Sequence, residues 1–65
     1  MTVEGLIVEA LPGFSFKVKL DEGREIIAYV SGKMRLRRIR VLLGDRVKIE
    51  LPDARAERGR IVWRF

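Results

Sequence analysis

Residues 14–38 read FSFKVKLDEGREIIAYVSGKMRLRR, which predicts a strand, a turn, a second strand and a short helix in that order. Apolar and polar side chains alternate in the first strand, over 14–20, so one of its faces is expected in the core. That face consists of Phe14, Phe16, Val18 and Leu20. The turn Asp21-Glu22-Gly23 leads into the second strand, over 24–30, and the two strands should therefore form a hairpin.

The second strand also has two distinct faces. Its core side is expected to hold Ile26, Ala28 and Val30, which leaves Ile27 and Tyr29 outside. Ser31-Gly32 can then cap a single helical turn that runs to about Arg38. So short a helix is unstable alone, and packing by Met34 or Ile39 must hold it.

Three further segments are predicted to be strands, over 3–11, 46–51 and 59–65. In the last one, Ile61 and Trp63 are expected on the core face. Five strands with a helical turn between the third and fourth have the order of an all-β, five-stranded OB-fold barrel. An SH3-like barrel also has five short strands, but the position of the helical turn favours the OB fold. One domain should span residues 1–65.

Composition excludes several classes of protein. The 65 residues include no cysteine and no histidine, so neither a disulfide nor most metal-site and general-base chemistry is expected. Asparagine and glutamine are absent too, which suggests an engineered, reconstructed or reduced-alphabet version of a natural domain. No apolar run approaches the ~20 residues that cross a bilayer, and the first residues do not resemble a signal peptide. A soluble, cytoplasmic protein is expected.

Charge is concentrated in one segment. Residues 33–40 hold five basic residues and no acid, while the rest of the chain holds nine of each sign, so the segment accounts for the whole net charge of +5. This is the electrostatic footprint of a protein that binds a phosphate backbone. A solvated positive loop without a partner is the alternative. A membrane-surface helix is disfavoured because Met34, Leu36 and Ile39 do not form one apolar stripe.

Catalytic candidates are weak. Ser15 and Ser31 have no histidine to activate them, and Asp21-Glu22 lies on a predicted turn, where acids are usually solvated. Neither a glycine-rich phosphate loop nor a metal-ligand cluster is present, so no cofactor and no enzymatic activity are expected.

Binding candidates lie on the outer face of the predicted hairpin. Lys17, Lys19 and Tyr29 share that face, where the ring could stack a base while the ammonium groups meet phosphates. Alternatively, Tyr29 only shields the sheet. Arg60 and Arg64 either extend the basic surface or are scattered, solvated arginines. The remaining aromatic residues are expected to pack in the core or at its rim: Phe14, Phe16 and Trp63.

Six stretches follow one another at a recognisable spacing: EGLIVEALP (4–12), FKVKL (16–20), AYVSGKMR (28–35), IRV (39–41), GDRV (44–47) and GRIV (59–62). Together they resemble the bacterial and plastid translation initiation factor one, and AYVSGKMR is similar to the hallmark stretch of that family. The resemblance covers nearly the whole chain. It implies an S1-like OB fold and a monomer located in the cytoplasm or the plastid stroma.

The resemblance also implies a function. Such factors dock in the aminoacyl site of the small ribosomal subunit, where they contact ribosomal RNA and a neighbouring ribosomal protein and cooperate with the two larger initiation factors. By matched position, Lys33, Met34 and Arg35 would lie in the RNA-contacting loop, and Gly32 would permit close approach of the backbone to RNA. The further basic contacts would be Arg40, Arg60 and Arg64.

The chain departs from the family at several positions. Arg38 stands where an aromatic residue is usual, Arg37 where Asn, His or Ser is frequent, and the 52–58 loop lacks a Pro-Tyr-Asp element. Added arginines favour unspecific phosphate attraction. Two alternatives therefore remain: a general single-stranded RNA binder or chaperone of cold-shock type, and an engineered barrel that binds RNA only non-specifically. The complete predicted RNA-binding set is Lys17, Lys19, Tyr29, Gly32, Lys33, Met34, Arg35, Arg37, Arg38, Arg40, Arg60 and Arg64.

Overall fold

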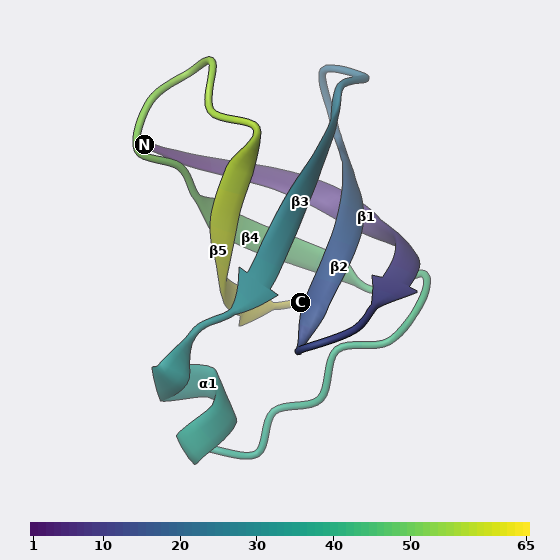
Figure 1. The fold of residues 1–65 in the computed structure, drawn as a ribbon, viewed down its shortest axis with the longest axis vertical. Helices are drawn as coiled ribbons and strands as arrows, with labels where there is room; N and C mark the ends of the chain where they lie inside the picture. Colours follow the sequence, from purple (N-terminus) through teal and green to yellow (C-terminus); the bar gives the residue numbers. More distant parts are fainter.

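The computed structural model describes residues 1–65 and is a closed barrel of five strands in the order β1-β2-β3-β5-β4 (Figure 1). The elements are β1 (Thr2–Leu11), β2 (Ser15–Leu20), β3 (Glu25–Val30), α1 (Gly32–Leu36), β4 (Arg46–Glu50) and β5 (Arg58–Arg64). The single helix lies between β3 and β4, which confirms the predicted OB fold. None of the helical structure is long and apolar enough to cross a membrane.

Strand pairing closes the sheet on itself. β1 pairs antiparallel with both β2 and β4, β2 and β3 form the predicted hairpin, and β3 runs parallel to β5. Closure removes the free edges that invite aggregation. The inward side chains form one core of Ile7, Val18, Leu20, Ile26, Ala28, Val30, Met34, Val41, Val47, Ile49, Leu51 and Ile61. The predicted core face of β3, with Ile26, Ala28 and Val30, is therefore confirmed.

Two glycines permit the strands to pack at this small radius. A Cβ at Gly5 would lie 2.6 Å from the backbone oxygen of Lys19, and one at Gly59 would lie 2.6 Å from side-chain carbons of Ile49 and Leu51. No side chain fits at those distances. Both glycines are therefore fixed by packing, and not by a turn.

The predicted core-face positions of two aromatic residues are wrong. Phe14 precedes β2, has a φ of 59° and is 63% exposed, so it belongs to the β1–β2 turn and not to the core. Trp63 is 48% exposed because the register between β4 and β5 shifts by one residue just before it. An extra residue in one strand moves all later side chains to the opposite face. Phe16, in contrast, packs against the core as expected.

Helix α1 begins with the predicted cap. The hydroxyl oxygen of Ser31 accepts a hydrogen bond from the backbone N–H of Met34 at 3.2 Å, and Met34 is buried. At the other end, the N–H groups of Arg38 and Ile39 donate to the carbonyls of Arg35 and Met34 at 3.0 and 3.1 Å. This pair of hydrogen bonds is a Schellman motif, which normally places glycine where this chain has Arg38.

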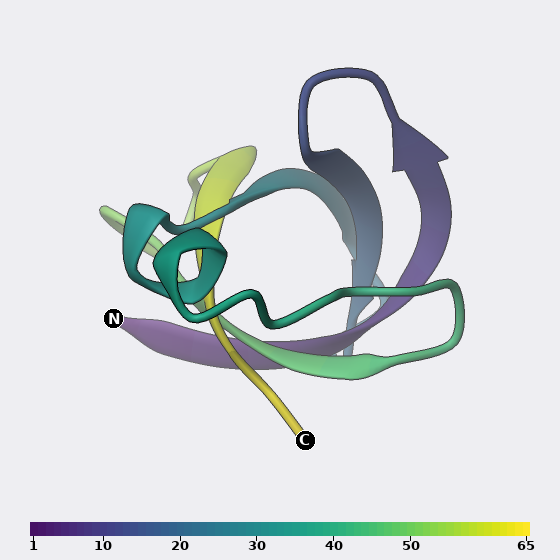
Figure 2. The same cartoon turned by 90° about the horizontal axis from the view of Figure 1, so that it is seen from below.

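The helix and the segment that follows it cross one open end of the barrel, here called the barrel mouth (Figure 2). The β1–β2 turn and the C-terminal residues lie at the same end (Figure 1). The β2–β3 turn and the loop over residues 52–57 lie at the opposite end. The fold thus brings the most basic segment of the sequence onto the barrel mouth.

Candidate nucleic-acid interface

The basic residues at the barrel mouth have no acidic partners. Five of them belong to α1 and the segment after it, and a sixth comes from β5, because the guanidinium of Arg64 donates to the carbonyl of Arg40 at 3.0 Å. None of the six lies within 4.0 Å of a carboxylate oxygen, and all are exposed. We call this group the mouth cations: Lys33, Arg35, Arg37, Arg38, Arg40 and Arg64. They form one uncompensated positive surface.

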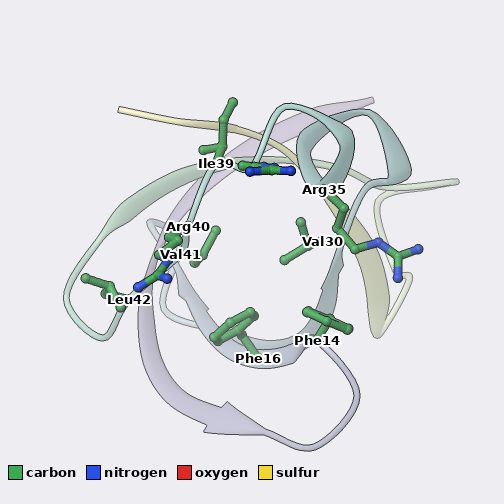
Figure 3. A pocket seen from close by; sticks show the side chains of 9 residues that line it. Phe14, Phe16, Val30, Arg35, Ile39, Arg40, Val41 and Leu42 are labelled. Atoms are coloured by element: carbon green, nitrogen blue, oxygen red, sulfur yellow. The ribbon is translucent and has the colours of Figure 1, made fainter.

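A pocket of about 460 Å³ lies at the barrel mouth, and three of the six mouth cations line it (Figure 3). Its apolar lining comes from the β1–β2 turn, β2, the end of β3 and the 39–42 segment, and includes both Phe14 and Phe16. Arg35, Arg38 and Arg40 add charge to the lining. The Arg35 guanidinium carbon lies 5.4 Å from the centre of the Phe14 ring, within cation–π range. An apolar interior with guanidinium groups suits a planar ring that carries phosphate.

Backbone strain is confined to this pocket. Arg38 and Phe14 are the two residues other than glycine with a positive φ, at 56° and 59°, and both line the pocket. The left-handed region disfavours side chains with a Cβ, so each residue costs the fold about 1 kcal/mol. Such outliers cluster at functional sites, which supports a binding role for the pocket.

Two residues of the hallmark stretch have different environments. Met34 is only 2% exposed and belongs to the core, so its side chain anchors α1 and does not offer a surface to RNA. A Cβ added at Gly32 would meet nothing within 4 Å, so only an external partner would require glycine there. Close approach of RNA at Gly32 stays a prediction.

The other predicted residues form a second surface on the outer face of β2, β3 and β5. Tyr29 is 50% exposed and lies opposite Arg60 of β5 and Ser15 of β2. Two cations of this second surface have acidic partners, because Lys17 pairs with Glu9 at 3.4 Å and Arg60 pairs with Glu50. Arg58, which the sequence analysis missed, lies opposite Ile27 on the same face. We call this surface the sheet platform: Lys17, Lys19, Tyr29, Arg58 and Arg60.

Apart from Gly32 and Met34, the predicted residues therefore divide between the mouth cations, which are unpaired, and the sheet platform, which is partly neutralised. Sequence reasoning could not separate them because ion pairing depends on which strands become neighbours. Arg58 could have been found from its position beside Gly59, had the β3–β5 register been known. No cluster of three potential metal ligands occurs in the chain.

Arg46 shows what a structural arginine looks like in this protein. Its guanidinium donates to Asp21 Oδ1 at 3.1 Å and to Glu4 Oε1 at 3.2 Å, joining β4 to the β2–β3 turn and to β1. The hydrogen bond to Asp21 is the main reason that the pKa of Arg46 is raised above its ordinary value. Its charge is thus committed within the protein.

Comparisons with known proteins agree with this geometry. The family model described as translation initiation factor 1A / IF-1 matches residues 1–65. The solution structure of translation initiation factor one from the Wolbachia endosymbiont of Brugia malayi is 46% identical, with a TM-score of 0.80, over 100% of this chain and 77% of that one. The crystal structure of YjeQ from Thermotoga maritima is 27% identical, with a TM-score of 0.79, over 100% of this chain and 23% of that one.

The family match spans the entire barrel, including α1, the mouth cations and both strands that flank the pocket. The match to the Wolbachia initiation factor covers about three quarters of that chain, whereas the YjeQ match covers less than a quarter of a longer one. The residues quoted above for the resemblance thus have independent support over their full length. The chain belongs to the translation initiation factor 1A / IF-1 family.

Proposed function

We propose that this protein binds the aminoacyl site of the small ribosomal subunit through contacts with its ribosomal RNA, and that it acts by binding and not by catalysis. The observation that carries the proposal is the group of six unpaired mouth cations, three of which line an aromatic pocket. Membership of an initiation factor family gives this surface its context.

The chemistry of the mouth fits structured RNA. Guanidinium groups bind phosphate oxygens with fixed geometry, and unstacked bases in loops are recognised by aromatic side chains and arginine planes. A pocket of about 460 Å³ lined by Phe14 and Phe16 has room for such a base. The mouth would therefore recognise the shape of an RNA site as well as its charge.

The remaining partners follow from the family and are part of the proposal. A neighbouring ribosomal protein would complete the binding site, and the two larger initiation factors would bind the same subunit. The protein would act as a monomer in the cytoplasm and without a cofactor.

Sedimentation of labelled protein with small ribosomal subunits tests the proposal. Retention on the subunits in the presence of excess single-stranded RNA is expected, because a shaped site competes better than an unstructured one. If about five phosphates are neutralised, a plot of log affinity against log salt concentration has a slope of about −3.5. A slope near zero would contradict a phosphate-based interface, and complete loss to the competitor would contradict a shaped site.

A second candidate function is general binding of single-stranded RNA, and the sheet platform favours it. Tyr29 is exposed between two strands that carry basic side chains, which is the arrangement of a stacking surface in OB folds. This activity would depend on Tyr29 and Lys19 and would survive removal of the mouth cations. Complete displacement by single-stranded RNA in the sedimentation experiment is its signature.

A further inference from the structure

The pairing of β5 with β4 contains one unpaired residue. Ile61 lies opposite Ile49 and Trp63 lies opposite Lys48, so Val62 is an extra residue on β5. Side chains on either side of such a bulge no longer alternate in phase. Ile61 is fully buried, whereas Trp63 is 48% exposed and shares the outer face with Lys48. The bulge thus turns the single tryptophan of the chain out of the barrel.

With Trp63 turned outward, the barrel is less stable than it would be with the ring buried in its core. A barrel of 65 residues has a small core, and a buried tryptophan would contribute more apolar area than any other side chain. Strict alternation after Ile61 would have placed the Trp63 ring inside. Bulges that re-aim a side chain are frequent at binding sites. The exposed ring therefore points to an external contact.

The surroundings of Trp63 indicate what it contacts. Lys48, directly opposite, has no carboxylate within ion-pairing distance. The next residue, Arg64, donates to the carbonyl of Arg40 at 3.0 Å and belongs to the mouth cations. Phe65, two residues beyond Trp63, is 58% exposed. The ring thus lies beside the free cation Lys48 on the outer face, and the next residue of β5, Arg64, connects the strand to the proposed RNA-binding surface.

We propose that Trp63 is a stacking platform for an unpaired base of single-stranded RNA, with Lys48 and Arg64 on its flanking phosphates. The inference rests on the proposed function and extends it, because an RNA strand that leaves the mouth over Arg64 meets this ring next. An acidic protein segment could also use an aromatic ring beside cations. Continuity with the mouth cations through Arg64 favours RNA.

Tryptophan fluorescence measures contact at this position directly, since Trp63 is the only tryptophan in the chain. Stacking of a base quenches indole fluorescence, whereas phosphate binding at a distance does not. The probe is a twelve-nucleotide oligoadenylate at low salt, with a matched oligomer that carries the same phosphates but lacks bases. Binding of each is followed separately by the anisotropy of an end label. We expect strong quenching by oligoadenylate and almost none by the abasic oligomer.

Variants measure how much the contact contributes. Trp63→Leu should lower affinity for oligoadenylate by about 5- to 100-fold, the range that corresponds to one stacked base, with an unchanged salt slope. Trp63→Phe keeps an aromatic ring and should retain most of the affinity. Leu6→Ala removes an apolar side chain of similar exposure, 45%, from β1 and should change affinity less than twofold. Thermal unfolding of each variant checks that the barrel is intact.

Each result has a definite meaning. Binding of oligoadenylate without quenching, or equal affinity for both oligomers, overturns the inference but leaves the proposed function standing. Quenching that appears only with ribosomal proteins would assign this face to a protein partner and also overturns the inference. No binding of oligoadenylate at low salt does the same. The proposed function fails separately, if small subunits do not retain the protein in sedimentation.

Discussion

Arg46 and Arg38 belong to two regions that handle positive charge in opposite ways. Arg46 is tied to Glu4 and Asp21, and its three-way contact fastens β1, β4 and the β2–β3 turn together. Arg38 and the other mouth cations have no acidic partner at all. The positive charge of Arg46, which joins strands of the barrel, is neutralised by carboxylates of the same protein, whereas the positive charge at the mouth remains available to a partner. The net charge of the sequence is thus located where a polyanion would bind.

The backbone repeats the contrast. Away from the mouth pocket, residues with positive φ are glycines, as at Gly23 in the β2–β3 turn. At the pocket, Arg38 and Phe14 adopt the same backbone region at a cost in free energy. Stability is therefore optimised in the barrel and given up at the mouth. Substitutions should separate these regions, since scaffold changes alter folding and mouth changes alter binding.

The largest effect is expected from Gly5→Ala, which breaks the scaffold. Its Cβ would lie 2.6 Å from the Lys19 carbonyl oxygen, and backbone atoms cannot yield as a flexible side chain can. We expect a loss of about 3 kcal/mol in the free energy of unfolding, measured by urea denaturation. The matched control is Gly32→Ala, where a Cβ meets nothing within 4 Å. Equal stability of the two variants would contradict the close-packed barrel.

The next effect concerns the mouth alone. The double variant Arg35→Ala, Arg37→Ala removes two unpaired cations and should lower affinity for small subunits by at least about tenfold. The salt slope should become shallower by about 1.4, since each lost phosphate contact contributes about 0.7. Because neither side chain is buried or ion-paired, the free energy of unfolding should change by no more than about 1 kcal/mol, the contribution of the lost contact between Arg35 and the Phe14 ring.

The control for this variant is Tyr29→Ala, Lys19→Ala on the sheet platform. If the mouth is the principal site, the platform variant keeps most of its affinity for subunits. If instead the platform variant loses more affinity than the mouth variant, general single-stranded RNA binding becomes the better description of the protein.

A smaller and purely structural effect is expected for Arg46→Ala. The variant loses the ion pairs to Glu4 and Asp21, so its unfolding midpoint should fall, and more so at low salt than at high salt. Because the pKa of Arg46 is higher in the folded than in the unfolded protein, its ion pairs stabilise the folded state at every pH below the unfolded-state pKa. This stabilisation is lost only as the pH rises through the higher pKa of the folded state. This contribution is therefore constant between about pH 6 and 9. Affinity for subunits should not change, and a clear loss would mean that Arg46 also faces RNA.

The sequence was sufficient for the parts of the fold that depend on local pattern. Alternation over 14–30 predicted the hairpin, and Ser31 before an apolar turn predicted the helix cap, because both rules act over a few residues. The bulge at Val62 was not predictable, since an extra residue is defined only against its partner strand. For the same reason, the outward Trp63 and the pairing of Arg60 with Glu50 appeared only in the structure.

The candidate site followed the same division. A run of five cations within 33–40 identified the binding segment from the sequence alone, because charge composition is local to the chain. Packing by Met34 was one of the two alternatives for holding the helix, whereas the exposure of Phe14 was not evident because it depends on the conformation of the β1–β2 turn. The site was therefore predictable in its charge and unpredictable in its pocket.

The smallest effect, at Arg38→Gly, tests the contrast at a single residue. Glycine adopts a φ of 56° without steric strain. The free energy of unfolding of the variant, measured by chemical denaturation, should therefore rise by up to about 1 kcal/mol, although a side chain is lost. Affinity for subunits should fall at the same time, with a salt slope shallower by about 0.7. Arg37→Gly removes an equal charge at a φ of −86°, where glycine relieves nothing and slightly destabilises the last helical turn. If both variants lose stability, Arg38 is not strained, and its left-handed backbone gives no sign that the mouth trades stability for binding.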